Sequence, residues 1–344
     1  MSVALRRWVQ ERLPIPMEEL RKPLREKLPV HLRGWIGWLG GTPLILLGIQ
    51  VMTGILLTFY YTPDPARAYQ SVRRITFGLR YGWLIRGLHQ RAAELMIIAL
   101  FLHMIRVFAT RAYRRPRELT WVFGMTLFLL TLGLGFTGYS LVYDSLSYWA
   151  TTVGTNLLGN VPLVGKDLLW LLRGGPDVNP NTLSRFYNFH IGVLPTLITA
   201  AVLAHLVLVR LHGVAPLEND PRKQTYDFFP EHVLREAAIA LVLLVALVVY
   251  TTLRPPGIGE PADPGVTPAH IRPEWYFFPS YRWLKIVPMQ VGIWTSAGFV
   301  LAMIFWPWVD AGLERVAPGR RLGTWLGSFG FLFTLSLLLW EAFS

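Results

Sequence analysis

The 344 residues include 53% hydrophobic and only 16% charged side chains, and the apolar residues gather into runs of about twenty. Such runs exclude an ordinary water-soluble domain, because each can cross the hydrocarbon of a bilayer as a helix. The formal net charge of +12 raises nucleic-acid binding as an alternative, but the Lys and Arg residues flank the apolar runs, as in membrane proteins. The absence of cysteine excludes disulfides, iron–sulfur clusters and covalently attached haem.

Seven apolar runs, taken in chain order, predict the crossings of an all-α, polytopic membrane protein. The predicted transmembrane helices are residues 36–60, 89–109, 121–142, 189–211, 235–253, 289–309 and 323–342. Eight basic residues precede the first run and four arginines follow the second, which predicts that both segments are cytoplasmic. The expected location is the cell inner (cytoplasmic) membrane, with the N-terminus inside and the C-terminus outside.

The connections between the runs divide the chain into two halves. Residues 143–188 are too polar to cross a membrane and too apolar for free solution, which predicts short amphipathic helices on the outer membrane surface. Residues 254–288 contain eight prolines and an aromatic cluster, and they also face outside in this topology. A stretch interrupted by prolines at 212–232 predicts a boundary between a four-helix domain, 1–215, and a three-helix domain, 216–344.

Four of the eight histidines lie within predicted helices, where a polar ring without a partner is costly. His89 and His103 are 14 residues apart on the second helix and share one face to within about 40°. His190 and His205 are 15 residues apart on the fourth helix, offset by about 60°. Treated as an antiparallel pair, the two helices place His89 and His190 near the outer face and the other two deeper, which gives two levels of facing imidazoles.

Two imidazoles at each level are typical of a six-coordinate haem iron that carries electrons. Zinc is the alternative, but two histidines without Cys, Asp or Glu nearby leave its tetrahedral shell incomplete. Glycines on the first and third helices repeat the 14-residue interval and would let a flat macrocycle approach the backbone, although small residues also serve ordinary helix packing. These glycines are Gly40, Gly54, Gly124 and Gly138.

Three arginines flank the histidines of the second helix, where haem propionates would emerge. They are Arg86, Arg91 and Arg106. Basic residues also anchor membrane helices at this depth, which is a competing interpretation. The sequence therefore predicts two non-covalent haems in a four-helix bundle, each between two histidines with glycine and arginine neighbours.

Five short stretches carry a resemblance to a known family. They are Gly82–Arg86, Pro116–Trp121, Gly138–Leu141, Arg185–Tyr187 and Pro273–Tyr276. With them the chain resembles cytochrome b of the bc-type quinol oxidoreductase complexes over nearly its whole length, and Pro-Glu-Trp-Tyr matches the quinol-site signature of that family. Residues 1–215 are similar to the chloroplast-type cytochrome b6, and the remainder is similar to its partner, subunit IV, fused into one chain.

The resemblance implies a subunit of a quinol:cytochrome c (or plastocyanin) oxidoreductase. Such a subunit oxidises quinol at an outer site and passes electrons through two b haems to an inner quinone site, coupled to proton translocation. His89 and His190 would hold the outer haem, and His103 and His205 the inner one. Quinol oxidation also releases protons, which need an acceptor within hydrogen-bond reach. The implied quinone-site residues are Glu274 as the proton acceptor, Tyr276 and Tyr139 in the outer pocket, and Arg210 near the inner site.

The same resemblance implies the partners of the chain. They are a Rieske-type iron–sulfur protein, a c-type cytochrome subunit, quinone and membrane lipid, in a homodimeric complex without nucleic acid. A covalent third haem, which the chloroplast-type protein attaches to a cysteine, is not expected because the chain has none. Two alternatives stay open: a di-haem anchor of a dehydrogenase or reductase, which would lack the Pro-Glu-Trp-Tyr loop, and a proton-coupled transporter, which would lack haem.

Overall fold

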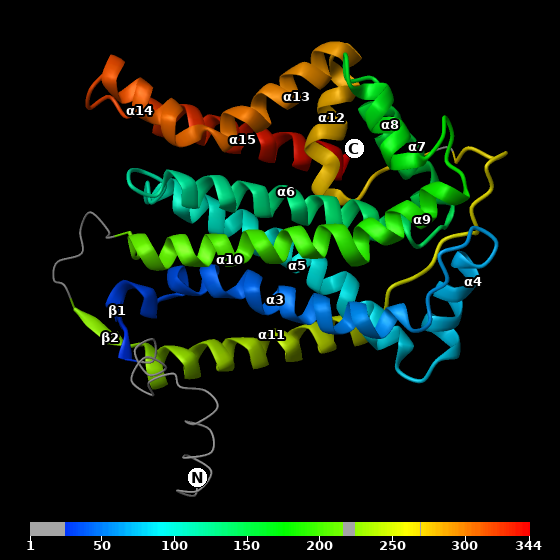
Figure 1. Ribbon diagram of the computed structural model, residues 1–344, viewed down its shortest axis with the longest axis horizontal. Coiled ribbons are helices and arrows are strands. Elements are labelled where there is room, and N and C mark those ends of the chain that lie inside the picture. The colour runs from blue at the N-terminus through cyan, green and yellow to red at the C-terminus, as the bar shows by residue number, and fades with distance from the viewer. Residues whose placement is uncertain (1–24, 216–223, 269) are drawn as a thin grey trace, which may run out of the picture.

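The computed structural model describes residues 25–215, 224–268 and 270–344. Long helices lie side by side along one direction, and short helices and loops gather at their ends (Figure 1). Five of the eight basic residues before the first apolar run fall within residues 1–24, so this part of the predicted orientation lies outside the described residues. The same holds for residues 216–223 at the centre of the predicted domain boundary.

Six helical spans are long and apolar enough to cross a bilayer, which confirms the all-α, polytopic fold and six of the predicted crossings. The helices concerned are α3 (Trp35–Thr58), α5 (Gly82–Ala109), α6 (Glu118–Ser140), α10 (Leu194–His212), which continues α9 (Pro180–Asn188) and η4 (Phe189–Val193), α11 (Val233–Leu253) and α15 (Leu322–Phe343). The remaining predicted crossing falls on two helices, α13 (Met289–Ile304) and α14 (Trp306–Val316). Only 6–33% of the apolar window of each of the six spans is buried within the described chain, as expected where lipid surrounds the helices.

The sixth predicted crossing, residues 289–309, is not one straight helix. α13 and α14 meet at Phe305 with a bend of 80°. The cause is Pro307, which has no amide hydrogen to donate to the carbonyl of Met303, four residues earlier. Trp121 Nε1 in α6 donates to that carbonyl instead, at 2.7 Å. The bend therefore leaves no unsatisfied carbonyl at Met303, and it ties the α13–α14 break to α6.

Short helices and two strands complete the chain at the ends of the long helices. They are β1 (Lys27–Pro29), η2 (Val30–Arg33), α4 (Ala68–Arg73), η3 (Arg74–Gly78), α7 (Ser145–Gly159), α8 (Gly165–Arg173), β2 (Thr225–Asp227), η5 (Phe228–His232), η6 (Trp275–Phe277) and α12 (Phe278–Ile286). α4, α7 and α8 lie at one end of the molecule, here named the α7 end (Figure 1). β1 pairs antiparallel with β2 at the opposite end, the α14 end. The short helices predicted within 143–188 are confirmed as α7, α8 and α9.

α5 and α10 run parallel, so the antiparallel arrangement expected from the sequence is wrong (Figure 1). α6 lies between them in the chain and returns it to the α7 end, from which both α5 and α10 start. His89 and His190 contact each other near these starts. At the other ends, Arg117 in the turn after α5 donates to the carbonyl of His212, the last residue of α10, at 3.1 Å. The parallel direction is what brings the two histidines of each pair to one level.

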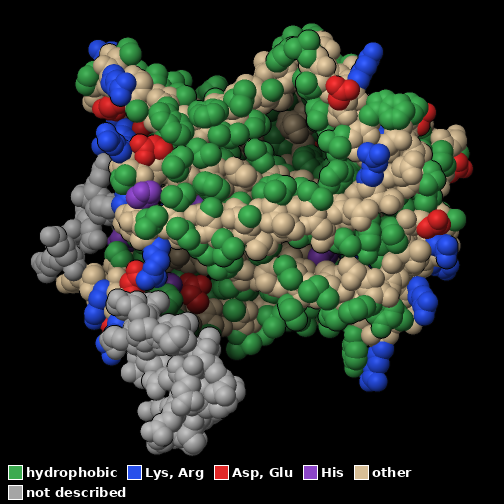
Figure 2. All heavy atoms as spheres, viewed as in Figure 1, with side chains coloured by type: hydrophobic (Ala, Val, Ile, Leu, Met, Phe, Trp, Pro, Cys, Tyr) green, Lys and Arg blue, Asp and Glu red, His purple; other side chains and the backbone are tan. Residues whose placement is uncertain are grey.

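The surface divides into an apolar middle and charged ends. Figure 2 shows hydrophobic side chains along the length of the helices and Lys, Arg, Asp and Glu side chains gathered at the α7 and α14 ends. In α11, Leu241, Val242 and Val245 are 63%, 67% and 54% exposed. Exposed aliphatic side chains in such numbers are stable only against lipid or another apolar surface. The chain is therefore a multi-pass membrane protein.

Candidate functional site

One pair of histidines faces each other between α5 and α10. The imidazole rings of His89 and His190 have centroids 6.1 Å apart and an interplanar angle of 76°. His190 lies in η4, a π-helical turn that widens the backbone where the chain enters α10. The structure thus brings together the two residues that the sequence predicts as one ligand pair.

Two threonine hydroxyls set the protonation of these rings. Thr53 Oγ1 lies 2.9 Å from His89 Nδ1, and Thr137 Oγ1 lies 3.1 Å from His190 Nδ1. Each hydroxyl also donates its hydrogen to the carbonyl four residues earlier on its own helix, at 2.6 and 2.9 Å. With its one hydrogen assigned to that carbonyl, each hydroxyl accepts from Nδ1–H, and Nε2 of each ring is left with a free lone pair. This is the tautomer that binds a metal through Nε2.

The four predicted glycines each face a predicted histidine ligand. A Cβ atom added at Gly138 would lie 2.6 Å from Cε1 of His190, and one added at Gly54 would lie 3.2 Å from the ring that it faces. The corresponding distances at Gly40 and Gly124 are 3.8 and 3.5 Å. A side chain is therefore excluded most strictly at the level of His190. Because all four glycines meet an imidazole, they do more than let two helix backbones pack closely.

The second pair, His103 and His205, lies nearer the C-terminal ends of α5 and α10 and is held differently. The two rings are within electrostatic range of each other, and Nδ1 of each is buried without a side-chain hydrogen-bond partner among the described residues. Arg106, one turn beyond His103, has its Nε buried and likewise without a partner among those residues. Within residues 25–215, 224–268 and 270–344, no three His, Cys, Asp or Glu side chains are grouped to hold a metal ion. Each level therefore offers two imidazoles.

The other predicted basic residues make protein contacts. Arg86 donates to the carbonyls of Pro256 and Gly257 at 3.2 and 3.0 Å. Arg91 donates to both oxygens of Glu94 at 2.9 and 3.1 Å, and its guanidinium lies 4.8 Å from the centre of the Tyr250 ring. These two arginines therefore bind α11 and the segment after it. The buried Nε of Arg91, like that of Arg106, has no hydrogen bond to the described residues, which suits an anionic group.

Arg210, predicted near the inner quinone site, lies at the α14 end. Its Nη1 is 2.9 Å from a carboxylate oxygen of Glu26, and both side chains are more than one third exposed. A nearby buried group is the ring of His212, whose Nδ1 has no hydrogen bond to the described residues. Arg210 thus lies at the same end of the bundle as the C-terminus of α10. A ligand that binds Arg210 would compete with the carboxylate of Glu26.

The predicted quinol-site residues converge where the 254–274 segment meets α6. Glu274 precedes η6, and Tyr276 packs so tightly against α6 that a Cβ at Gly135 would lie 2.9 Å from its hydroxyl oxygen. Tyr139 is one turn beyond Gly135 and lies within electrostatic range of Glu274. The structure therefore gathers a carboxylate and two phenols at the α7 end of the bundle, beside the helix that carries Gly138.

The charge of Glu274 is tuned by its surroundings. Burial raises the pKa of Glu274, the carboxylate of Glu94 raises it further, and the guanidinium of Arg91 opposes them. Burial and the carboxylate of Glu274 raise the pKa of Tyr276, so this phenol stays protonated. A carboxyl group whose pKa is raised toward neutral pH suits proton uptake from a bound donor.

Sequence reasoning missed three residues of these sites. Glu94 lies inside the predicted helix 89–109, and an ionisable residue at membrane depth is itself a signal of function. Thr53 and Thr137 each precede a predicted glycine, Gly54 and Gly138. The repeated Thr-Gly pair at one histidine level, and its absence at the other, was the available signal.

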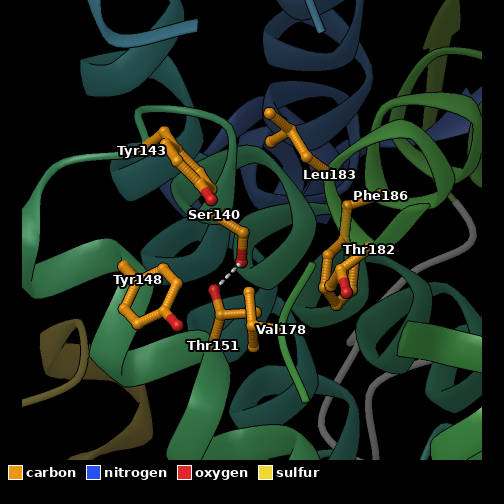
Figure 3. Close-up of a pocket in the computed structure, with 8 residues that line it drawn as sticks. All are labelled: Ser140, Tyr143, Tyr148, Thr151, Val178, Thr182, Leu183 and Phe186. Atoms are coloured by element: carbon orange, nitrogen blue, oxygen red, sulfur yellow. Dashed lines mark hydrogen bonds between the residues drawn. The ribbon is translucent and has the colours of Figure 1, made fainter. Parts of the chain in front are cut away.

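A small cavity lies beside the quinol-site residues, where α6 turns into α7 (Figure 3). It holds about 10 Å³, roughly the room that one water needs. Thr151 Oγ1 donates to Ser140 Oγ across it at 2.7 Å, and Tyr143 and Tyr148 close one side. The cavity is too small for a quinone ring.

Comparison with known proteins agrees with this arrangement. Residues 25–213 match the family described as Cytochrome b/b6/petB, and residues 261–342 match the family described as Cytochrome b(C-terminal)/b6/petD. The chain is 34% identical over 339 residues to "Cytochrome b" of Rickettsia bellii (strain RML369-C), which covers 94% of this chain and 83% of that protein. It is 35% identical over 343 residues to "Cytochrome bc complex cytochrome b subunit" of Chlorobaculum thiosulfatiphilum, covering 96% and 78%.

Two further similarities concern the N-terminal part and the fold. "Cytochrome b6" of Heliobacterium modesticaldum (strain ATCC 51547 / Ice1) is 41% identical over 209 residues, which are 60% of this chain and 98% of that protein. A chain of the solved structure "Hyperthermophilic respiratory Complex III" superposes with a TM-score of 0.79 and 27% sequence identity, covering 96% of each chain.

Proposed function

Because the chain belongs to the cytochrome b family and is a subunit of a bc-type quinol oxidoreductase complex of electron transport, we propose that it holds two haems b without covalent bonds. His89 and His190 would bind one iron, and His103 and His205 the other. When bound, haem supplies one-electron transfer, for which two imidazole ligands are suited. The observation that carries the proposal is the facing His89–His190 pair, with rings 6.1 Å apart and both Nε2 lone pairs free.

The residues around the histidines fit a flat, anionic macrocycle. The four glycines keep side chains away from the imidazoles, and Arg106 offers a buried, unpartnered Nε to a propionate. Arg86 and Arg91 are proposed as further propionate partners, for which each would share the backbone contacts it makes with residues 254–257.

Quinol oxidation is proposed to take place at the convergence of Glu274, Tyr276 and Tyr139. When a quinol becomes a quinone it gives up two electrons and two protons, and a carboxylate within hydrogen-bond reach accepts one proton. Glu274 is proposed for this role, since its raised pKa brings it closer to the pKa that efficient proton uptake requires. Tyr276 and Tyr139 would orient the quinol hydroxyls as protonated phenols.

We propose the membrane orientation, domains and partners of the chain on the same basis. The α7 end faces the outside of the cell inner membrane, the N-terminus lies in the cytoplasm, and Arg210 lies near an inner quinone site. Electron flow between the two quinone sites is coupled to proton translocation. The domains are a di-haem half, 1–215, and a half carrying the quinol loop, 216–344. The partners are a Rieske-type iron–sulfur protein and a c-type cytochrome, in a dimer of the complex.

The test is the absorbance of b-type haem in the purified complex. His89→Ala and His190→Ala each remove one of two haems, so about half of the reduced-minus-oxidised b absorbance is lost, because an iron left with one imidazole has lost half of its protein ligands. His270→Ala, which changes an exposed loop histidine, is the control and keeps the full signal. A wild-type complex without any b-type absorbance, or full absorbance in both ligand variants, contradicts the proposal.

A further inference from the structure

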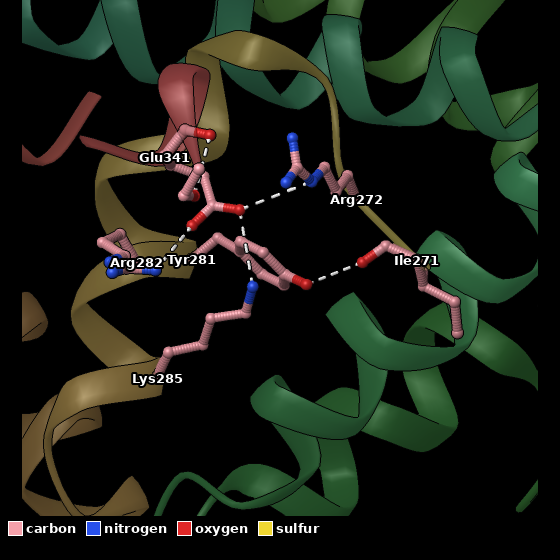
Figure 4. A network of polar contacts seen from close by, with 7 residues as sticks. Ile271, Arg272, Tyr281, Arg282, Lys285 and Glu341 are labelled. Carbon is pink, nitrogen blue, oxygen red and sulfur yellow. Dashed lines mark hydrogen bonds and ion pairs between the residues drawn. The ribbon is translucent and has the colours of Figure 1, made fainter. Parts of the chain in front are cut away.

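A carboxylate near the C-terminal end of α15 is fully buried among three cations. Glu341 is 0% exposed, yet it belongs to an otherwise apolar helix. Its oxygens lie 3.7 Å from Arg272 Nε, 3.4 Å from Arg282 Nη1 and 3.4 Å from Lys285 Nζ (Figure 4). A buried carboxylate is costly unless it is paired, so these cations are needed for it to stay in place.

The cations around Glu341 come from both sides of one short segment. Arg272 directly precedes Pro273, the first residue of Pro-Glu-Trp-Tyr, whereas Arg282 and Lys285 lie on α12, which starts directly after η6. The segment that carries Glu274 and Tyr276 is therefore flanked on both sides by cations that share the carboxylate of Glu341. Since the distances of 3.4 to 3.7 Å are long for ion pairs, the carboxylate acts as a common centre and not as the partner of one cation.

Neighbouring contacts add to this arrangement (Figure 4). Tyr281 Oη donates to the carbonyl of Ile271 at 2.7 Å, which closes the segment between residue 271 and α12. The Arg282 guanidinium lies 3.9 Å from the centre of the Trp340 ring, and Lys285 Nζ lies 4.1 Å from that of Tyr281. Arg282 and Lys285 thus each contact an aromatic face, which restricts their side chains around the carboxylate.

We propose that Glu341 is a positioning residue for quinol oxidation, because it fixes both ends of the segment that presents Glu274 and Tyr276 to α6. The inference rests on the quinol site proposed above. Glu341 does not touch substrate; it acts through Arg272 and α12. A shift of about 1 Å in a positioned group costs up to about a hundredfold in rate, so the loss of this centre is expected to be visible in catalysis.

The experiment compares Glu341→Gln and Glu341→Asp with Glu314→Gln in the purified complex. Gln keeps the shape but removes the charge, whereas Asp keeps the charge one methylene further away. Glu314 is an exposed carboxylate of α14 that pairs with Arg114 at 3.5 Å, which makes it a matched control. The measurements are kcat and KM for a soluble quinol analogue, b-haem absorbance, and hydrogen exchange of residues 270–286.

For Glu341→Gln we expect kcat/KM for quinol to fall about tenfold to a hundredfold, with both haem bands retained and faster exchange confined to residues 270–286. Glu341→Asp restores part of the loss, and Glu314→Gln behaves as wild type. Wild-type kinetics and exchange in Glu341→Gln overturn the proposal. Loss of both haem bands in the Gln and Asp variants also overturns it, because the carboxylate would then serve general stability.

The results that would contradict the quinol-site proposal differ from those that would contradict the role of Glu341. If Glu274→Gln leaves turnover unchanged, the proton-acceptor role fails, while exchange in residues 270–286 of Glu341→Gln still reports whether the segment is held by Glu341. A wild-type complex that oxidises no quinol removes the proposed function itself.

Discussion

Two single residues, Thr53 and Thr137, make the His89–His190 pair chemically different from the His103–His205 pair. Each accepts a hydrogen bond from Nδ1 of a ligand histidine, whereas His103 and His205 have no such partner among the described residues. A hydrogen bond accepted from Nδ1–H makes an imidazole a stronger electron donor to a metal. The two levels of the bundle therefore offer chemically different ligands from the same residue type.

Thr137→Val is expected to raise the midpoint potential of one b haem and to leave the other unchanged. Without the acceptor, the His190 imidazole donates less electron density, and the reduced iron is favoured. A redox titration of the b absorbance measures the effect. Thr126→Val is the control, because Thr126 lies on the same helix and donates to Val122 O at 3.0 Å without contacting a histidine. Equal potentials in both variants and wild type would show that the hydroxyl has no tuning role.

Glu94→Gln is expected to move the acid limb of quinol oxidation to lower pH. Glu274 accepts a proton only when ionised, so a raised pKa places this limb at a higher pH than an ordinary carboxyl group would. Removing the Glu94 charge lowers the pKa of Glu274, whereas Arg91→Gln removes an opposing charge and moves the limb to higher pH. A pH–rate profile is the measurement, with the exposed Glu260→Gln as the control. Shifts in the same direction for Glu94→Gln and Arg91→Gln contradict this account.

The histidines and glycines were predictable because helical periodicity converts a 14- or 15-residue interval into a face and a depth. The Thr-Gly pairs marked the positions of the two threonines, but their bonds to the histidines were not predictable. A hydroxyl in a helix ordinarily donates back to its own backbone, and only the packed partner reveals its second bond. Glu94 was detectable by its depth, but its relation to Glu274 depends on how the 254–274 segment folds back, which no local pattern encodes.

At the scale of secondary-structure elements, the bend between α13 and α14 was not predictable from the sequence alone. Hydropathy summed over residues 289–309 predicts one crossing, because it contains no information on the direction of the helix axis. Pro307 was the sequence signal for a break, but prolines also occur within α3 and α10, where the helix continues. The difference is that Trp121 is placed to take over the carbonyl of Met303, and this packing partner is distant in the sequence.

α7 and the 254–274 segment are held together by Asp144. Its Oδ1 accepts from Ser147 N at 2.9 Å and caps α7, and its Oδ2 accepts from Gly259 N at 3.1 Å. Asp144→Ala is expected to cost about 1–2 kcal/mol through the lost cap and to leave Gly259 N unpaired. The start of α7 and residues 254–268 should both loosen.

Limited proteolysis measures this loosening, as faster cleavage within residues 254–268. Asp263→Ala is the matched control, because the exposed Asp263 caps only a local turn through Gly265 N at 2.8 Å. Cleavage of Asp144→Ala at the rate of the control would mean that the segment is held by its other contacts alone.

At the scale of the whole molecule, the class of protein and the sequence of crossings follow from composition and the apolar runs. The relative direction of the helices was harder to predict. Whether α5 and α10 run parallel depends on the number of crossings between them and not on either helix alone. Residues 254–268 and 270–274 contain no helix or named strand from which their path is predictable. Their path is set by partners from α4, α5 and α7, such as Tyr69 Oη, which donates to Gly259 O at 2.9 Å.

These contacts mean that the two halves of the molecule are joined at both ends without help from the covalent link between α10 and α11. At one end β1 pairs with β2, and at the other Arg86 and Asp144 bind the backbone of residues 257–259. A chain interrupted between α10 and α11 would therefore yield two polypeptides that recognise each other. One gene or two could encode the same assembly, because the information that docks the halves resides in their surfaces and not in the peptide bond between them.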